Sequence, residues 1–142
     1  MSGEDAGVAR ADRGRHLALH LPGGLLLLDV EVAGRVEPAL TVLPVPHSPE
    51  GVIGLAELRG RPVTLIDPSV WLEGRGRLAS SPAELGAGGV QALLLAPPLN
   101  HLAFGLPPSA TLRPLRGSPE SGVVLDAKAI VARFAPAVQP AP

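Results

Sequence analysis

The chain has 142 residues, a formal net charge of −1, 46% hydrophobic residues, 17 glycines, 17 prolines and no cysteine. Its near-neutral charge and three aromatic residues argue against a nucleic-acid-binding barrel, and the lack of cysteine excludes disulfides, thiol catalysis and cysteine-based zinc sites. The frequent glycine and proline favour short strands and turns, in one compact unit or two small subdomains, over long helices.

The N-terminal residues 1–15 are polar and small, which predicts a disordered segment and no secretory signal. No apolar run in the chain approaches the roughly 20 residues that a membrane-spanning helix needs. We therefore expect a soluble, cytoplasmic protein that does not insert into membranes.

Short apolar runs separated by turn residues predict strands along most of the remaining chain. These strands are expected at residues 16–21, 25–32, 36–43, 52–58, 62–66, 90–96, 101–106, 110–115 and 122–126. The run at 25–32 is continuously apolar, as expected for a strand that is buried on both faces. Gly34 is expected to allow a bend or bulge near the third strand.

Two aspartates, Asp67 and Asp126, each end a predicted strand and precede a short helix, at 68–72 and 127–134. Aspartate is a favoured helix N-cap, so both are expected to have a structural role. Residues 73–89 are rich in glycine, serine and alanine and predict a linker, and residues 135–142 predict a flexible tail. The parts before and after the linker follow the same order of elements, which suggests two similar halves.

Residues that could carry catalysis or bind metal do not form a recognisable pattern. His16 and His20 share one face of a predicted strand but are about 13 Å apart along it, at roughly 3.3 Å per residue. There is no G-x-S-x-G motif to assemble a hydrolytic triad, and no phosphate-binding loop that ends in lysine. We expect a non-enzymatic protein without cofactor or metal; a small β-barrel enzyme is the alternative from another class.

The sharp corner at residues 59–61 separates two apolar strands, and Gly60 can adopt the positive φ that a tight turn requires. Such a turn would hold the Arg59 side chain outward, beside the apolar Val52, Ile53 and Leu55. Arginine is enriched at interface hot spots, so Arg59 is either a solvated turn residue or an interface anchor.

The stretch from Leu43 to Leu72 resembles the core of CheW-like domains, the adaptors of bacterial chemotaxis arrays. Pro46 and Pro49 match the family's proline-containing approach. The residues that match the motif after it are Gly54, Arg59, Gly60, Val63, Ile66 and Asp67. Weaker similarities in the flanking segments extend the resemblance over roughly residues 16–134.

The resemblance implies an all-β fold of two small, interlocked, SH3-like five-stranded barrels with short capping helices, within a single domain at 16–134. The segment at 113–121 is shorter than is usual in the family, so the second barrel is expected to be trimmed. The implied partners are the cytoplasmic tip of a chemoreceptor and the regulatory domain of a CheA-type histidine kinase. The implied location is a receptor array near the inner membrane.

Carried over by position, the resemblance assigns partner binding to the predicted β-hairpin around Arg59. The residues are Val52, Ile53, Gly54, Glu57, Arg59 and Gly60, with Glu57 in the place of the family's usual asparagine. The expected function is a non-enzymatic adaptor that couples chemoreceptors to the kinase. The alternative is a divergent paralogue that has lost kinase binding and acts in a side branch of the pathway.

Overall fold

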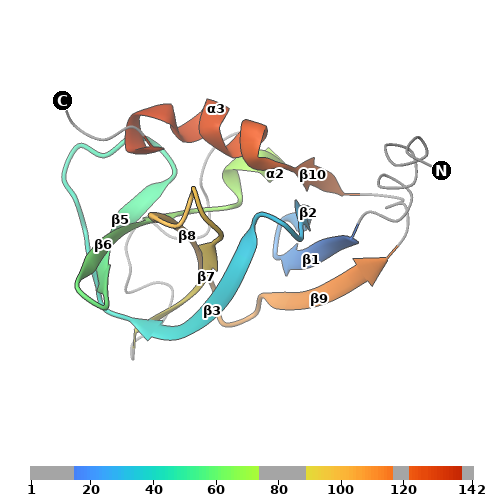
Figure 1. Cartoon of the computed structure of the whole chain (residues 1–142), viewed down its shortest axis with the longest axis horizontal. Coiled ribbons are helices and arrows are strands. Elements are labelled where there is room, and N and C mark those ends of the chain that lie inside the picture. Colours follow the sequence, from blue (N-terminus) through green and yellow to red (C-terminus); the bar gives the residue numbers. More distant parts are fainter. Residues whose placement is uncertain (1–14, 74–88, 117–121, 139–142) are drawn as a thin grey trace.

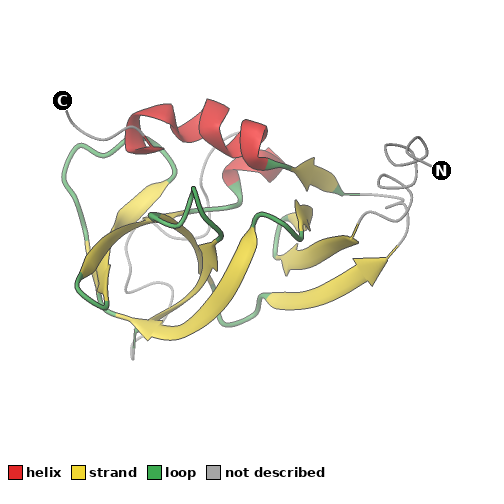
Figure 2. Cartoon of the chain, viewed as in Figure 1, coloured by secondary structure: helices red, strands yellow, loops and turns green. Residues whose placement is uncertain are grey.

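A computed structural model of the protein describes residues 15–73, 89–116 and 122–138 (Figure 1). These residues form two curled β-sheets and two short helices (Figure 2). The predicted disordered N-terminus and the predicted linker lie outside the described residues, except at their borders. None of the described helices is long and apolar enough to cross a bilayer. The predicted all-β class with short capping helices is confirmed.

The smaller sheet joins the two ends of the described chain in the order β10-β2-β1-β9. Its strands are β1 (Arg15–Leu21), β2 (Gly24–Asp29), β9 (Thr111–Arg116) and β10 (Val123–Leu125). β1 and β2 form the predicted hairpin, β9 pairs antiparallel with β1, and β10 pairs parallel with β2. The two halves of the chain therefore do not form separate sheets, because the N-terminal hairpin pairs with C-terminal strands and not with those that follow it.

β2 ends three residues earlier than predicted, because Asp29 starts a turn. Its Oδ1 accepts the N–H of Glu31 at 2.9 Å, and its carbonyl accepts the N–H of Val32 at 2.8 Å. An aspartate that bonds its own backbone two residues on favours a turn over a continued strand.

The larger sheet has the order β3-β7-β8-β6-β5-β4 and curls into a ring in Figure 2. Its strands are β3 (Ala33–Leu40), β4 (Val42–Leu43), β5 (Val52–Leu58), β6 (Arg61–Ile66), β7 (Val90–Leu95) and β8 (Leu102–Leu106). The predicted third strand is thus divided into β3 and the two-residue β4, which lie at opposite edges. The pairing register of β3 shifts between Ala33 and Val36, so the bulge expected at Gly34 is present.

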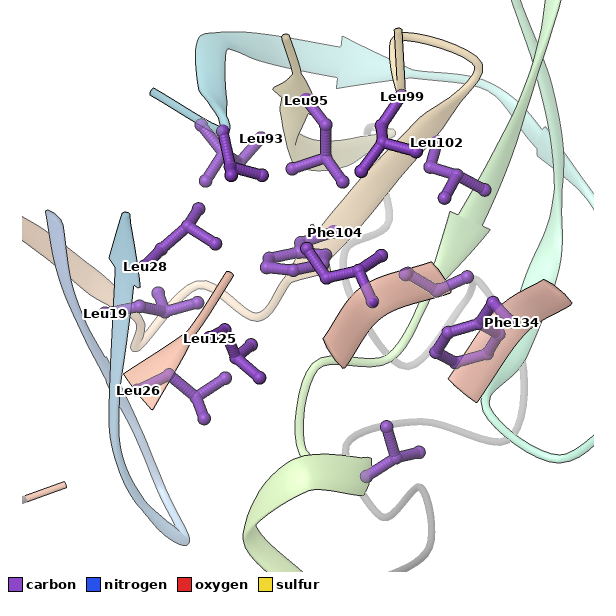
Figure 3. Packing of buried hydrophobic residues seen from close by; sticks show 14 of the residues in the cluster. Leu19, Leu26, Leu28, Leu93, Leu95, Leu99, Leu102, Phe104, Leu125 and Phe134 are labelled. Atoms are coloured by element: carbon purple, nitrogen blue, oxygen red, sulfur yellow. The ribbon is translucent and has the colours of Figure 1, made fainter. Parts of the chain in front are cut away.

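Two hydrophobic cores share the strands β7 and β8. The side chains of Leu93 and Leu95 point into the core between the two sheets, whereas Ala92 and Leu94 point into the core inside the larger sheet. Burial on both faces explains why these strands are apolar at nearly every position. Figure 3 shows Phe104 of β8 at the centre of the inter-sheet core, among leucines of both sheets.

The helices α2 (Val70–Glu73) and α3 (Ala127–Val138) cover the inter-sheet core and begin next to the two aspartates. Asp67 Oδ1 accepts the N–H of Ser69 at 2.9 Å, and Asp126 Oδ1 accepts the N–H of Ala129 at 2.9 Å. α3 continues four residues beyond the predicted end, across a kink at Phe134 where φ is −122° and ψ is 35°. The predicted tail therefore begins within a helix.

All three aromatic residues of the chain meet in the inter-sheet core. The ring centroid of Trp71 lies 5.7 Å from that of Phe104 and 5.5 Å from that of Phe134. Tilted and edge-to-face rings at these separations attract each other beyond the gain from burial. The cluster joins α2, β8 and α3, so it links both helices to the larger sheet.

Candidate partner-binding surface

The β5–β6 hairpin is closed by a two-residue turn, in which Leu58 pairs with Arg61 across Arg59 and Gly60. Both turn residues have positive φ, 51° for Arg59 and 82° for Gly60. This is the type I′ geometry that matches the natural twist of paired strands. The turn fixes the backbone of Arg59, and 60% of its side chain is exposed to solvent.

A carboxylate on β3 lies between two arginines at this end of the larger sheet. Oε2 of Glu37 lies 2.8 Å from Nε of Arg35 and 3.7 Å from Nη1 of Arg59. Only 12% of the Glu37 side chain is exposed, so its charge needs these partners in place of water. Because β3 is an edge strand, the pair with Arg59 connects that edge to the β5–β6 turn as the sheet curls.

We expect Glu37 to be coupled more strongly to Arg35 than to Arg59, since the first pair is a hydrogen-bonded ion pair and the second is longer. Double-mutant cycles with Glu37→Gln, Arg35→Ala and Arg59→Ala, followed by urea unfolding, measure both couplings. The expected values are about 0.5–1 kcal/mol for Arg35 and below about 0.5 kcal/mol for Arg59. A larger coupling to Arg59 would mean that the turn, and not the neighbouring arginine on β3, holds the carboxylate.

The outer side of β4, β5 and β6 presents a row of two exposed leucines and one half-buried threonine. Leu43 pairs with Leu55, and Leu55 pairs with Thr64, so the three side chains lie side by side on one face. Leu43 is 68% exposed and Leu55 is 40% exposed. Glu57 and Pro62 form the next exposed row toward the turn. We call these five residues, Leu43, Leu55, Glu57, Pro62 and Thr64, the hairpin face.

Ile53 and Gly54, two of the residues assigned to partner binding, are buried. The register of β5 against β6 shifts between Val52 and Gly54, which makes Ile53 the extra residue of a bulge. The bulge turns Ile53 into the core of the larger sheet, where it is 6% exposed. A β-carbon at Gly54 would collide with the carbonyl oxygen of Leu43. Neither residue offers a side chain to a partner, so their assignment is revised to support of the hairpin.

The other assigned residues are at least partly accessible. Glu57, Arg59 and Gly60 are exposed, and Val52 is half-buried and packs against the inter-sheet core. The sequence analysis placed Leu55 beside Arg59 but assigned it no role, and it did not consider Leu43. The charge of Glu57 was the available signal for Leu55, because a carboxylate favours the solvent side of a strand and residues two apart share a face. Nothing local in the sequence indicates that Leu43 lies beside Leu55.

The histidines and acidic residues of the described ranges contain no group of three that could hold a metal ion. On β1, His20 is exposed and His16 is half-buried. Asp67 and Ser69 are buried at the start of α2, where the Ser69 hydroxyl donates to Asp67 Oδ1 at 2.7 Å. This buried pair organises the start of the helix.

Two curled sheets that interlock, with a hairpin turn at Arg59 and two short capping helices, define a CheW-like fold. A solved structure supports this description: the crystal structure of the scaffolding protein TtCheW from Thermoanaerobacter tengcongensis superimposes with a TM-score of 0.55. The match covers 76% of this chain and 67% of that protein, at 16% sequence identity. No protein-family model and no curated protein sequence matches the chain.

Proposed function

We propose that this protein is a non-enzymatic, CheW-like adaptor that couples a chemoreceptor to a CheA-type histidine kinase in a bacterial chemotaxis pathway. The observation that carries the proposal is the pair of exposed leucines, Leu43 on β4 and Leu55 on β5, beside the hairpin whose turn contains Arg59. The CheW-like fold supports it, since the similar protein from Thermoanaerobacter tengcongensis is described as a scaffolding protein.

The hairpin face has the chemistry of a binding surface. Full burial of a leucine against a partner is worth about 1.5–3 kcal/mol, so Leu43 and Leu55 together supply a small apolar centre. Arg59 stands at the end of this surface with its backbone fixed by the turn, so only the freedom of its side chain is lost when its guanidinium binds. An arginine beside an apolar centre is a typical arrangement of interface hot spots.

We assign the hairpin face and Arg59 to the receptor tip, and the kinase regulatory domain to a separate surface. The mechanism is scaffolding: the adaptor fixes the relative position of receptor and kinase, and signals pass as changes in conformation. The protein would act in the cytoplasm, at receptor arrays beside the inner membrane.

The test is calorimetric titration of the full chain with a fragment of the cognate receptor tip and, separately, with the kinase regulatory domain. Arg59→Ala and Leu55→Asp should each weaken receptor binding about tenfold or more, a cost of about 1.4 kcal/mol or above. Arg113→Ala is the matched control, since Arg113 is an exposed arginine on β9 of the smaller sheet. Trp71 fluorescence verifies that each variant is folded.

Unchanged receptor binding by both hairpin variants would contradict the assignment of this surface, and binding to neither partner would contradict the adaptor function. Receptor binding without kinase binding would favour the second candidate, a divergent paralogue in a side branch. The observation that favours this candidate is the smaller sheet, in which the described residues supply four strands, fewer than the five of an untrimmed barrel.

A further inference from the structure

A second surface feature lies away from the hairpin face. A hollow of about 360 Å³ opens between the β2–β3 turn, the β7–β8 turn and the start of α3. This volume lies at the lower end of the range of about 300–1,000 Å³ typical of ligand pockets. None of the five residues of the hairpin face lines it, so the hollow belongs to a different part of the surface.

The floor of the hollow is apolar, and backbone hydrogen bonds connect the two turns that form its walls. Val32 and Leu99 line it and are 8% and 4% exposed, and Pro97 and Pro98 add the flat surfaces of their rings. The N–H of Ala96 donates to the carbonyl of Val32 at 2.7 Å, which joins the two turns. The N–H of Leu99 donates back to the carbonyl of Ala96 at 2.9 Å. The hollow is therefore preformed, and a ligand need not order it.

The charged residues around this floor are predominantly acidic. Asp29, Glu31 and Asp126 contribute three carboxylates and Lys128 contributes one ammonium, a formal balance of −2. Asp29 and Asp126 each use one carboxylate oxygen to accept a backbone N–H, and Glu31 forms no ion pair with the described residues. The positive end of α3 offsets only about half a unit charge. A cation with an apolar stem complements this combination of floor and charge.

We propose that this hollow binds the side chain of an arginine presented by an exposed segment of a partner protein. The methylene stem of the arginine packs on Val32 and the proline rings, while its guanidinium pairs with Glu31 and with the open carboxylate oxygen of Asp126. A planar guanidinium offers several N–H donors in fixed directions, whereas lysine offers a compact and strongly hydrated charge. The proposal rests on this hollow alone and does not depend on the adaptor function.

The test uses the ¹⁵N-labelled full chain and three short peptides, acetyl-Ala-Arg-Ala-amide and its citrulline and lysine counterparts. Citrulline has nearly the shape of arginine without its charge. The arginine peptide should bind weakly, with a Kd on the order of millimolar, and shift the amide resonances of Glu31, Val32, Leu99 and Lys128. Glu31→Gln should weaken binding about two- to fivefold, and Lys128→Gln should strengthen it, because the first removes a partner charge and the second a competing one. Glu50→Gln, at an exposed carboxylate outside the hollow, is the matched control and should have no effect.

Weaker binding at raised salt and no binding of the citrulline peptide would support the proposal. Equal shifts with the citrulline peptide would overturn it, since the charge would then be irrelevant. Equal binding of the lysine peptide would overturn the choice of arginine. Shifts scattered over the surface, or shifts unaffected by Glu31→Gln, would place any binding outside the hollow and overturn the site.

Discussion

Phe104→Ala is expected to lower the free energy of unfolding by about 3–5 kcal/mol, the usual cost of removing a buried phenylalanine ring. Phe104 is fully buried at the centre of the inter-sheet core and contacts the ring of Trp71. Domains of this size are typically stable by about 5–15 kcal/mol, so the variant would retain only a part of its stability. Phe104→Leu, which keeps most of the volume, should cost clearly less.

Urea unfolding followed by the fluorescence of Trp71, the single tryptophan of the chain, measures this effect directly. Val124→Ala is the matched control: Val124 lies on β10 and is 52% exposed, so its truncation should cost less than about 1 kcal/mol. If Phe104→Ala and Val124→Ala destabilised the protein equally, the two sheets would not share the core around Phe104. A change in Trp71 fluorescence without a loss of stability would likewise contradict the central position of Phe104.

Gly54→Ala is expected to displace β4 from the larger sheet and to destabilise the protein by about 1–3 kcal/mol, the usual cost of overpacking. The added methyl group would collide with the carbonyl oxygen of Leu43 and lie 2.8 Å from Cγ1 of Val42. β4 has only two residues and pairs only with β5, so β4 should yield before the longer β5 does. Since β4 carries Leu43, the substitution should also weaken the proposed receptor contact.

Hydrogen exchange distinguishes this local displacement from general destabilisation. In Gly54→Ala the amides of Val42, Leu43 and their partners on β5 should exchange faster, while those of β7 and β8 should change only with global stability. Gly60→Ala is the control: its β-carbon would meet nothing within 4 Å, but φ is +82°. It should therefore cost about 1–2 kcal/mol through backbone strain and leave the pairing of β4 intact. Protection of β4 that is equal in both variants would contradict the close approach at Gly54.

Binding and stability can be separated because Leu55 of the hairpin face is exposed, whereas the neighbouring Gly54 is buried. Leu55 is 40% exposed, so Leu55→Asp should change receptor binding with little loss of folding free energy. Gly54→Ala should change both, since it acts through the position of a strand. Comparing the two variants in one titration series tests whether the surface itself, or only the stability of the hairpin, controls the proposed receptor contact.

Local patterns were sufficient to predict most strands and the turn at Arg59. Alternating apolar residues and turn-forming glycines act over a few residues, so the β5–β6 hairpin was predicted with its bounds almost unchanged. The division of β3 from β4 was not predicted, because no glycine or other clear turn signal separates Leu40 from Val42. The bulge at Ile53 was not predicted either, since it arises from the pairing of β5 with β6 and not from the composition of β5.

The sequence by itself determined the all-β class, the short helices beside Asp67 and Asp126, and the exposed arginine in a tight turn, because these depend on local backbone preferences and on periods of a few residues. Only the tertiary structure decided which strands are neighbours. The pairing of β1 and β2 with β9 and β10, the burial of Ile53 and the contact of Leu43 with Leu55 all join residues distant along the chain. Such contacts follow from how apolar faces are buried together in three dimensions, and a one-dimensional pattern does not encode which face meets which.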